Sequence, residues 1–364
     1  MLIQAAVLEQ RENQRPYAEH RPLALRAVQL DGPGPGEVLV RINAAGLCHS
    51  DLSVIDGNRP RPVPMVLGHE SAGIIEQAGE GVDLAVGQQV ISVFLPRCGH
   101  CSACATGGKL PCIAGTEANT AGTLLTGARR LSMDGSPVHH HLGVSAFADH
   151  AVMDARSLVP VGRDVPPEVA AVLGCAVLTG GGALRNAAHA GGVEDVAIVG
   201  LGGVGMAALL VAVGQRTTGK ILAIDANEDK LATALELGAD EACTPQDLAG
   251  RGAQIVIEAA GHPRAFETAL SATGVGGTLV TVGLPAPGAM SSIEPLALTA
   301  GARTIIGSYM GSALPAKDIP YYEELWRSGR LPVEKLVRTR PMAQINEALD
   351  ELAEGRSVRQ VLLP

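Results

Sequence analysis

Short apolar runs and amphipathic stretches alternate in the second half of the chain. The runs are apolar along most of their length, which is typical of strands buried on both faces of a parallel sheet; they span residues 196–199, 221–224, 254–257 and 278–282. Between two of them, residues 228–237 carry apolar side chains three and four positions apart, the spacing of a helix with one buried face. This alternation predicts βαβ units and hence a doubly wound α/β sheet.

The first 165 residues show a different pattern, in which short β-like runs are broken by glycine and proline. Residues 37–42, 71–76 and 89–94 are three such runs. Several short strands separated by turn residues predict a barrel-like, β-rich domain.

The end of the chain leaves the βαβ pattern again. A last strand of that series is expected at 303–306, and it is followed by two helix-like segments (317–327 and 342–354) and a closing strand at 358–363. Because these segments do not extend the repeat, we expect the chain to return to the first domain. The predicted organisation is a β-rich domain of residues 1–175 and 310–364, with a parallel-sheet domain of residues 176–309 between its two parts.

Composition narrows the class of protein. A length of 364 residues suggests two domains, and 46% hydrophobic with 18% charged residues is typical of a globular protein. The net charge of −9 disfavours nucleic acid and anionic membranes as partners. The beginning of the sequence has no signal-peptide pattern, so we expect the cytoplasm, where seven cysteines would serve metal binding rather than disulfides.

One uncharged stretch is long enough to span a membrane. Residues 196–214 contain no charge, but they hold five glycines, four of them between Gly200 and Gly205. A strand, a glycine turn and a helix explain this composition better than a membrane span.

The glycine turn has the pattern of a dinucleotide site. Gly200-Leu-Gly202-Gly203-Val204-Gly205 follows an apolar strand and opens an apolar helix. Its glycines permit a tight turn, a close approach of a pyrophosphate, and close packing of helix on strand. Asp225 ends the next strand, where a carboxylate binds ribose hydroxyls and repels a 2′-phosphate, so the pattern favours NAD over NADP. The alternative is an ordinary βα turn with a solvated aspartate.

Four of the seven cysteines lie within fifteen positions. Cys98, Cys101, Cys104 and Cys112 have the density and spacing of ligands that surround one tetrahedral zinc ion. Four cysteine ligands leave no coordination position open for a substrate, so the pattern indicates a structural metal site.

Other metal-ligand residue types are scattered along the chain. They include Cys48, His69, Glu70 and Cys175. Each has a simpler explanation, since a lone cysteine is often a small buried apolar residue and a lone histidine a satisfied loop residue. Spacing alone does not show whether these distant residues converge.

A family resemblance bears on this question. The segment Gly68-His69-Glu70-x₂-Gly73-x₅-Gly79-x₂-Val82, the cysteine cluster and the glycine turn occur here in the same order as in zinc-dependent alcohol dehydrogenases of the medium-chain dehydrogenase/reductase family. The chain is similar to that family over essentially its whole length. The resemblance implies a GroES-like catalytic domain with a structural-zinc lobe at about residues 96–115, and a Rossmann domain that binds NAD.

The resemblance also implies roles for individual residues. Two zinc ions are implied per chain, a structural one in the cysteine cluster and a catalytic one held by Cys48, His69 and Cys175, with the fourth position left to water or substrate. Glu70 would be an occasional ligand, Asp51 would accept a hydrogen bond from His69, and Ser50 would take the substrate proton. The remaining implied contacts are with NAD for His49, Thr179, Val204, Lys230 and Arg359, and with the alcohol for Phe94 and Leu284. Arg359 as a surface charge and Thr179 as an ordinary helix residue are the alternatives.

Two positions depart from the family pattern, and several other residues are expected to have no role in a site. Ser53 replaces a histidine that ends the proton relay in some relatives, and Thr116 replaces an arginine of relatives that oxidise the glutathione adduct of formaldehyde. Residues 112–147 are expected to form a long loop, in which His139-His140-His141 would be solvated. Cys243 is expected to be inert.

The expected activity is reversible hydride transfer between an alcohol and NAD, giving an aldehyde or ketone and NADH. Alternatives within the family are a reductase of bulky carbonyls, a dehydrogenase of S-hydroxymethyl thiols, and a zinc-free quinone reductase. A zinc-ribbon binding module is the non-enzyme alternative. A homodimer is expected, with a tetramer as the alternative, while the substrate, its stereochemistry and the preferred direction are left open.

Overall fold

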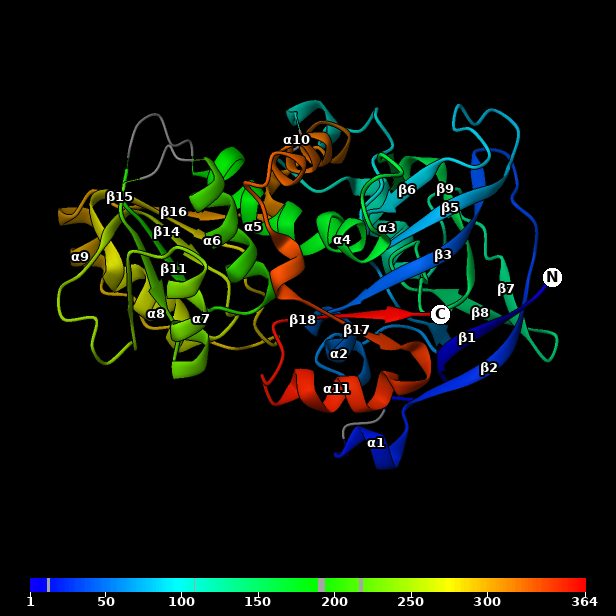
Figure 1. Ribbon diagram of the computed structural model, residues 1–364, viewed down its shortest axis with the longest axis horizontal. Coiled ribbons are helices and arrows are strands. Elements are labelled where there is room, and N and C mark those ends of the chain that lie inside the picture. The colour runs from blue at the N-terminus through cyan, green and yellow to red at the C-terminus, as the bar shows by residue number, and fades with distance from the viewer. Residues whose placement is uncertain (12–13, 108, 189–193, 216–218) are drawn as a thin grey trace. The chain divides into compact units, whose positions relative to one another are not determined.

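A computed structural model describes the chain from residue 1 to residue 364 except for residues 12–13, 108, 189–193 and 216–218 (Figure 1). The chain forms two compact units. The first comprises Met1–Cys175 and Val337–Pro364, and the second comprises Ala176–Leu336.

The first unit is built on a closed barrel and a larger sheet. The barrel has the strand order β1-β2-β7-β8-β4, and the seven-stranded sheet has the order β10-β6-β5-β3-β18-β17 with β9 also paired to β3. The strands are β1 (Leu2–Leu8), β2 (Leu23–Leu30), β3 (Glu37–Leu47), β4 (Met65–Val66), β5 (Ser71–Ala78), β6 (Gln89–Ser92), β7 (Leu131–Met133), β8 (Ser136–His140), β9 (His150–Asp154), β10 (Leu158–Pro160), β17 (Val337–Pro341) and β18 (Arg359–Leu363). This architecture confirms the predicted GroES-like, β-rich domain.

The helices of the first unit are short. They are α1 (Tyr17–His20), α2 (His49–Ile55), α3 (Ile113–Ala121), α4 (Pro167–Val172) and α11 (Ile345–Ala353), with 3₁₀ turns η1 (Cys104–Thr106), η2 (Ala155–Ser157) and η7 (Met342–Gln344). Apolar side chains of α11 such as Ile345 and Leu349 belong to the same buried core as Val40 and Leu47 of β3. That core fixes the end of β3, from which the candidate site extends.

The second unit is a six-stranded parallel sheet of order β13-β12-β11-β14-β15-β16. Its strands are β11 (Val196–Val199), β12 (Ile221–Ile224), β13 (Glu241–Cys243), β14 (Ala253–Glu258), β15 (Thr273–Thr281) and β16 (Thr304–Gly307). The helices are α5 (Leu178–Gly182), α6 (Gly203–Gln215), α7 (Glu228–Glu236), α8 (Pro263–Ala272), α9 (Pro295–Ala300) and α10 (Pro315–Arg327), with a π-helical turn η4 (Ala183–Ala187) and 3₁₀ turns η5 (Tyr309–Ser312) and η6 (Val333–Leu336). The doubly wound Rossmann fold is confirmed.

The segment 310–336 packs differently from the sequence-based expectation. The sequence pattern predicts that it belongs to the first domain, but it belongs to the second unit. Asp318 of α10 accepts hydrogen bonds from Arg185 (3.2 Å) and Asn186 (3.2 Å), and the Tyr322 ring lies against Gly181 of α5. The helix was predicted, but these partners, more than 100 residues earlier in the chain, carry no local signal.

The uncharged stretch 196–214 forms β11, the glycine turn and α6, as expected. A different run, Pro167–Ala187, is long and apolar enough to cross a membrane by length and composition. It is 89% buried inside the protein, which is the behaviour of a core helix.

The segment 112–147 is not a long loop. It contains α3, β7 and β8, and the last two strands close the barrel. The sequence of α3 has little apolar periodicity, so the pattern gave no helix signal there. Its start is instead fixed by Cys112, whose sulfur accepts a hydrogen bond from the N–H of Gly115 (3.4 Å).

Candidate metal centres and coenzyme site

Strand register brings three polar segments to one end of the large sheet in the first unit. Cys48 directly follows β3, and Gln360 of the antiparallel β18 pairs with Leu47, so Arg359 lies beside Cys48. On the other side of β3, Ala45 pairs with Ser71 of β5, which places Glu70 at the same end. The sheet itself therefore gathers residues from positions 48, 70 and 359.

Four potential ligand atoms meet at this end of the sheet. Those of Cys48, His69, Glu70 and Cys175 all lie within 4.8 Å of one another. Cys175 comes from a π-helical turn, η3 (Leu173–Val177), which continues α4, and its sulfur is 3.6 Å from His69 Nε2. Such turns often occur at functional sites, because the wider turn redirects one side chain.

Asp51 orients the histidine. It is completely buried, and its Oδ1 lies 3.0 Å from His69 Nδ1 and accepts a hydrogen bond from the N–H of Gly68 (3.3 Å). Its Oδ2 accepts a hydrogen bond from the N–H of Cys48 (3.0 Å). Burial raises the pKa of Asp51, but His69 and His141 outweigh it and lower that pKa to about 2. An anionic Asp51 leaves His69 Nε2 free to act as a ligand.

Glu70 is paired but keeps one oxygen unused. Its Oε2 forms a buried ion pair with Arg359, whereas its Oε1 is buried without a hydrogen-bond partner. Burial raises the pKa of Glu70 to about 7, and the Cys48 thiolate adds to this rise, against the opposing effect of Arg359. A buried carboxylate oxygen with no partner is a potential metal contact.

This donor set fits zinc. Two cysteine sulfurs and one imidazole nitrogen are the ligands that zinc prefers, and three protein ligands leave one position for a small molecule. A hydrogen bond from Cys175 and the proximity of His69 hold the pKa of the Cys48 thiol well below its usual value, against the effect of burial. The lowered pKa favours the thiolate form of Cys48, which is the form that binds a metal ion.

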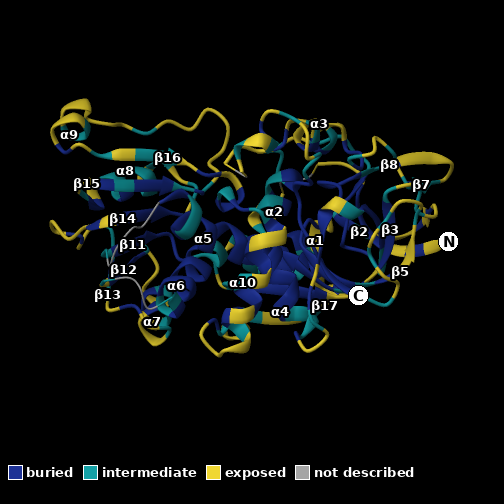
Figure 2. Cartoon of the chain, turned by 90° about the horizontal axis from the view of Figure 1, so that it is seen from above, coloured by how far each residue is buried: buried dark blue, intermediate teal, exposed yellow. Residues whose placement is uncertain are grey.

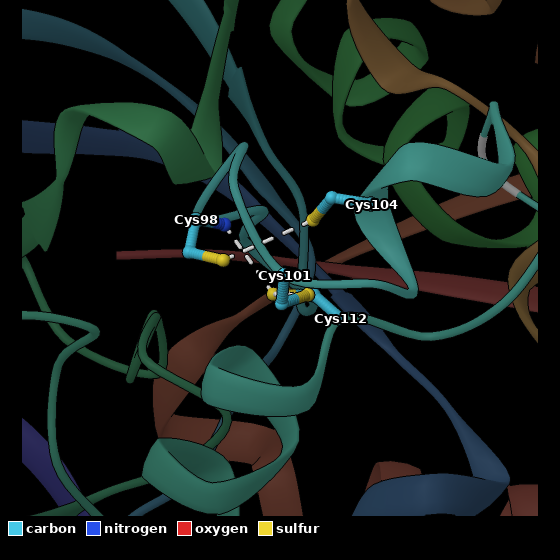
Figure 3. Close-up of side chains that lie close together, drawn as sticks. All are labelled: Cys98, Cys101, Cys104 and Cys112. Atoms are coloured by element: carbon cyan, nitrogen blue, oxygen red, sulfur yellow. Dashed lines mark hydrogen bonds between the residues drawn. The ribbon is translucent and has the colours of Figure 1, made fainter.

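The cysteine cluster forms a second group of ligands. The sulfurs of Cys98, Cys101, Cys104 and Cys112 lie within 4.8 Å of one another, and Figure 3 shows the four side chains pointing toward a common centre. Hydrogen bonds from the N–H groups of Ile113 and Cys104 lower the pKa of Cys101 to about 6, whereas burial raises that of Cys104 to about 11. Four thiols converging in this way are the donor set of a structural zinc site.

The glycine turn of the second unit has the geometry that a dinucleotide requires. Gly200 has φ +91°, and a Cβ atom on Gly205 would overlap the carbonyl oxygen of Gly200. A Cβ on Gly202 would meet nothing within 4 Å, so the space above the turn is open to a phosphate. Gly203 and Val204 begin α6, whose N-terminus faces this space.

Asp225 lies beside the turn, and Lys230 lies in the helix that follows it. Asp225 follows β12 and accepts hydrogen bonds from the N–H of Leu201 (2.6 Å) and of Asn227 (2.9 Å). Lys230 is half-buried in the first turn of α7, where Asn227 caps the helix. Thr179 is a buried residue of α5, and α5 packs closely on α6 through Gly180.

The other candidate residues are placed as follows. His49 is exposed and Ser50 half-buried in the first turn of α2, and Phe94 is buried with its ring edge-on to His69 (5.7 Å between centroids). Leu284 lies in the second unit and is half-exposed. Arg359 is buried, so the alternative that it is a surface charge is wrong.

The interpretation of His139-His140-His141 as a solvated loop is also wrong. His140 lies in β8, and both His140 and His141 are buried. His141 Nδ1 is 3.3 Å from Asp51 Oδ1, so this residue joins the group around His69. The only sequence signal was the alternation in β8, where Val138 and His140 point inward.

Comparisons with known proteins agree with this geometry. The family model "Alcohol dehydrogenase GroES-like domain" matches residues 34–163, and "Zinc-binding dehydrogenase" matches residues 203–327. The chain is 37% identical to a geraniol dehydrogenase of Castellaniella defragrans over 357 residues, which are 94% of each chain. It is 33% identical to a class-3 alcohol dehydrogenase of Drosophila melanogaster over 361 residues, again 94% of each.

Solved structures show the same fold over the whole chain. An alcohol dehydrogenase zinc-binding domain protein from Burkholderia ambifaria matches with a TM-score of 0.92 and 33% identity. Benzyl alcohol dehydrogenase from Acinetobacter calcoaceticus matches with a TM-score of 0.90 and 30% identity. Each match covers 100% of this chain and 99% of the other. Acetophenone reductase from Geotrichum candidum, solved in complex with NAD, matches with a TM-score of 0.81 and 26% identity. This match covers 100% of this chain and 97% of the other. The chain therefore belongs to the zinc-dependent alcohol dehydrogenases of the medium-chain dehydrogenase/reductase family, with zinc and NAD as its cofactors.

Proposed function

We propose that this enzyme oxidises a primary allylic or benzylic alcohol to the aldehyde, with NAD as hydride acceptor. In this proposal Cys48, His69 and Cys175 hold the catalytic zinc, and the four clustered cysteines hold a structural one. The observation that carries it is the convergence of the three ligand atoms within 4.8 Å, with Asp51 fixing the histidine.

The residues around the metal have separate tasks. When bound, zinc supplies a Lewis acid that makes an alcohol hydroxyl more acidic. Ser50, in the first turn of α2, takes the released proton toward water. Because Ser53 donates its hydroxyl to the carbonyl of His49 (2.8 Å) where some relatives have a histidine, the relay passes from Ser50 to solvent. Glu70 remains paired to Arg359 and is available as an additional ligand during exchange.

The coenzyme residues follow from the glycine turn. The open backbone at Gly202 and the N-terminus of α6 bind the pyrophosphate, and Asp225 binds the adenosine ribose. By the family resemblance, Val204 and Thr179 would contact the nicotinamide, Lys230 would contact the ribose, and His49 and Arg359 would neutralise the phosphates.

The substrate class is inferred from the relatives and from two positions of the chain. Geraniol is an allylic alcohol and benzyl alcohol a benzylic one, and dehydrogenases named for both are similar to this chain over nearly its whole length. The buried Phe94, beside His69, would contact such an apolar alcohol, and the family resemblance implies the same contact for Leu284, which is 49% exposed. Thr116 donates its hydroxyl to the Cys112 carbonyl (2.8 Å) and offers no cation for a carboxylate, which disfavours the glutathione adduct of formaldehyde.

The metal assignment is tested by zinc analysis of variants purified without chelator. The wild type should contain about two zinc ions per chain, and Cys48→Ala about one, with turnover lost. Cys243→Ala is the matched control, because that thiol is buried in the second unit and should leave both zinc ions and the rate unchanged. A zinc content of one or less in the wild type would contradict the proposal.

The substrate is tested by initial rates of NADH formation over a panel of alcohols. We expect kcat/KM for geraniol and benzyl alcohol to exceed that for ethanol by about tenfold or more, since each buried methylene contributes about 0.8 kcal/mol. A preference for S-hydroxymethylglutathione would instead assign the enzyme to the thiol-adduct dehydrogenases.

Two further properties belong to this proposal. None of the seven cysteines, all of which the structure describes, forms a disulfide, which suits the reducing cytoplasm. The enzyme is a homodimer that pairs through the edge of the parallel sheet.

A further inference from the structure

We propose that His141 is a positioning residue for the zinc ligand His69, acting through the carboxylate of Asp51. The inference rests on the proposed catalytic zinc site. It concerns a residue that neither the cofactor nor the ligand assignments use.

The two histidines share one carboxylate oxygen. His69 Nδ1 lies 3.0 Å and His141 Nδ1 3.3 Å from Asp51 Oδ1, and all three side chains are at most 1% exposed. The rings of His141 and His69 meet edge to face, with centroids 5.5 Å apart and an interplanar angle of 84°. His141 Nδ1 is buried and has no hydrogen-bond partner among the described residues, and Asp51 Oδ1, 3.3 Å away, is the carboxylate oxygen within its reach.

The backbone holds His141 in this place. The chain from His141 to Phe147 runs along the segment that leads to His69: Ala146 N–H donates to the Gly68 carbonyl (3.1 Å) and Phe147 N–H to the Leu67 carbonyl (3.0 Å). The Ser145 hydroxyl donates to the Val66 carbonyl (2.9 Å) and accepts from the N–H of His141 (2.9 Å). His141 is therefore anchored to the same stretch of backbone as His69.

This turn is held in an unfavourable conformation. Leu142 and Ser145 have φ values of +52° and +54°, in the left-handed region that side chains other than glycine seldom adopt. Residues in such conformations persist where the surrounding structure fixes them, and they cluster at functional sites. Here the conformation brings the His141 ring onto Asp51.

The function of His141 follows from the demands on Asp51. A carboxylate that is completely buried needs several donors, and Asp51 already collects N–H groups from Cys48 and Gly68, each in or beside a ligand segment. The His141 ring N–H, 3.3 Å from Asp51 Oδ1, would supply a further donor from a third segment. Without it Asp51 would be held less firmly, and so would the His69 ring that it orients.

The test compares His141→Phe with His141→Asn. Phenylalanine keeps the edge-to-face packing but removes the N–H group, whereas the asparagine amide can place an N–H near the position of Nδ1. His139→Phe is the matched control, because His139 lies against Gly122. The first measurement is the rate at which the chelator dipicolinate removes the catalytic zinc from the holoenzyme. The second is the visible absorption band of enzyme with Co²⁺ in the catalytic site.

We expect His141→Phe to lose the catalytic zinc about tenfold faster than the wild type. Loss of a residue that supports a metal ligand typically weakens metal binding by about ten- to a hundredfold, and this expectation takes the lower value. The visible absorption band of the cobalt enzyme should also shift. The structural zinc should be retained at the wild-type rate. His141→Asn should restore both properties toward the wild type, and His139→Phe should match it.

Equal rates and spectra for His141→Phe and wild type would overturn the inference, as would a failure of His141→Asn to restore them. Should His141→Phe fail to fold, as judged by its circular dichroism, His141→Leu and His141→Gln provide the same comparison. A wild type that holds no zinc at Cys48, His69 and Cys175 would overturn the proposed function itself, and the zinc content of the wild type distinguishes this result from the others.

Discussion

At the scale of single residues, the proposed role of Asp225 in the choice of coenzyme can be tested. Its carboxylate accepts hydrogen bonds from Leu201 in the glycine turn and from Asn227 before α7. Asp225→Ser should raise KM for NAD about tenfold or more, because hydrogen bonds to a charged group contribute about 1.5–3 kcal/mol. It should also raise the ratio of kcat/KM for NADP to that for NAD, since the charge that repels a 2′-phosphate is gone.

Initial rates with both coenzymes measure this effect. Asp229→Ser, on the exposed first turn of α7, is the control and should change neither value. A coenzyme ratio that stays the same in Asp225→Ser would mean that another group excludes NADP.

Glu37, in β3, provides a pH-dependent contribution to stability. It is buried, and it accepts hydrogen bonds from Arg130 Nε (2.7 Å), Thr126 Oγ1 (2.6 Å) and the Gly34 N–H (2.9 Å). Burial raises the pKa of Glu37, but these hydrogen bonds outweigh it and lower the pKa below its ordinary value of 4.5. A group with a lowered pKa stabilises the folded state fully above pH 4.5 and loses that effect as the pH falls through the folded-state pKa.

Glu37→Gln should therefore lower the free energy of unfolding by about 1–2 kcal/mol at pH 7. The difference from the wild type should shrink below pH 4.5. Urea unfolding at several pH values measures it. Glu76→Gln, which breaks an exposed ion pair with Arg41 (2.9 Å), should have little effect, and an equal loss in both variants would contradict this account.

The sequence could identify the metal ligands only where they are close together in the chain. Cys98, Cys101, Cys104 and Cys112 need no tertiary information, because their spacing alone brings the sulfurs within reach. Cys48, His69 and Cys175 converge through strand register and a π-helical turn, so they could be grouped only through the family resemblance. His141 was missed because three adjacent histidines rarely bind one ion; in the structure only one of them faces Asp51.

At the scale of elements, the cysteine lobe is linked directly to helix α3. Cys112 caps α3, and two turns later Asn119 donates its amide to the carbonyl of Phe94 (2.7 Å). A metal held by Cys112 would therefore also fix the start of a helix that is bonded to a candidate pocket residue, Phe94. The sequence of this helix, Ile-Ala-Gly-Thr-Glu-Ala-Asn-Thr-Ala, has no apolar stripe, so its position depends on these contacts.

Loss of the structural metal should therefore loosen the lobe. Cys98→Ser removes one ligand of the structural zinc, so this variant should contain about one zinc per chain, the catalytic one. Because metal binding supplies much of the folding energy of such a segment, the lobe should then be less stable. Trypsin should then cleave after Arg97 or Lys109 at least about tenfold faster than in the wild type. Mass spectrometry of the fragments measures this, with Cys243→Ser as the control; a cleavage rate equal to that of the wild type would show that the lobe folds without its metal.

At the scale of the whole molecule, the sequence predicted both folds but not every boundary. The strands of the parallel sheet are predictable because each is a short apolar run. For β11 and β12 the predicted first and last residues are those of the structure. The segment 310–336 was assigned to the wrong unit because α10 is held by Arg185 and Asn186, whose partners no local pattern reveals.

The exposed edge of the parallel sheet carries the last prediction, that the enzyme is a homodimer. Strand β16 pairs only with β15 among the described strands, and an unpaired edge is open to pairing across a two-fold axis. Beside it, Leu296 of α9 is 70% exposed and Val275 of β15 is 77% exposed. Figure 2 shows α9 exposed along most of its length. The two segments are joined near β16, because the N–H of Gly276 donates to the carbonyl of Gly301 (2.7 Å).

Light scattering should give the wild type twice the chain mass of 37.3 kDa. The double variant Val275→Lys with Leu296→Lys should give one chain mass and keep a cooperative thermal transition, because like charges would face one another across the axis. Val86→Lys changes an equally apolar side chain, 65% exposed in the first unit, and should remain a dimer. A wild type of one or four chain masses would contradict the dimer, and a double variant that stays dimeric would place the interface on another face.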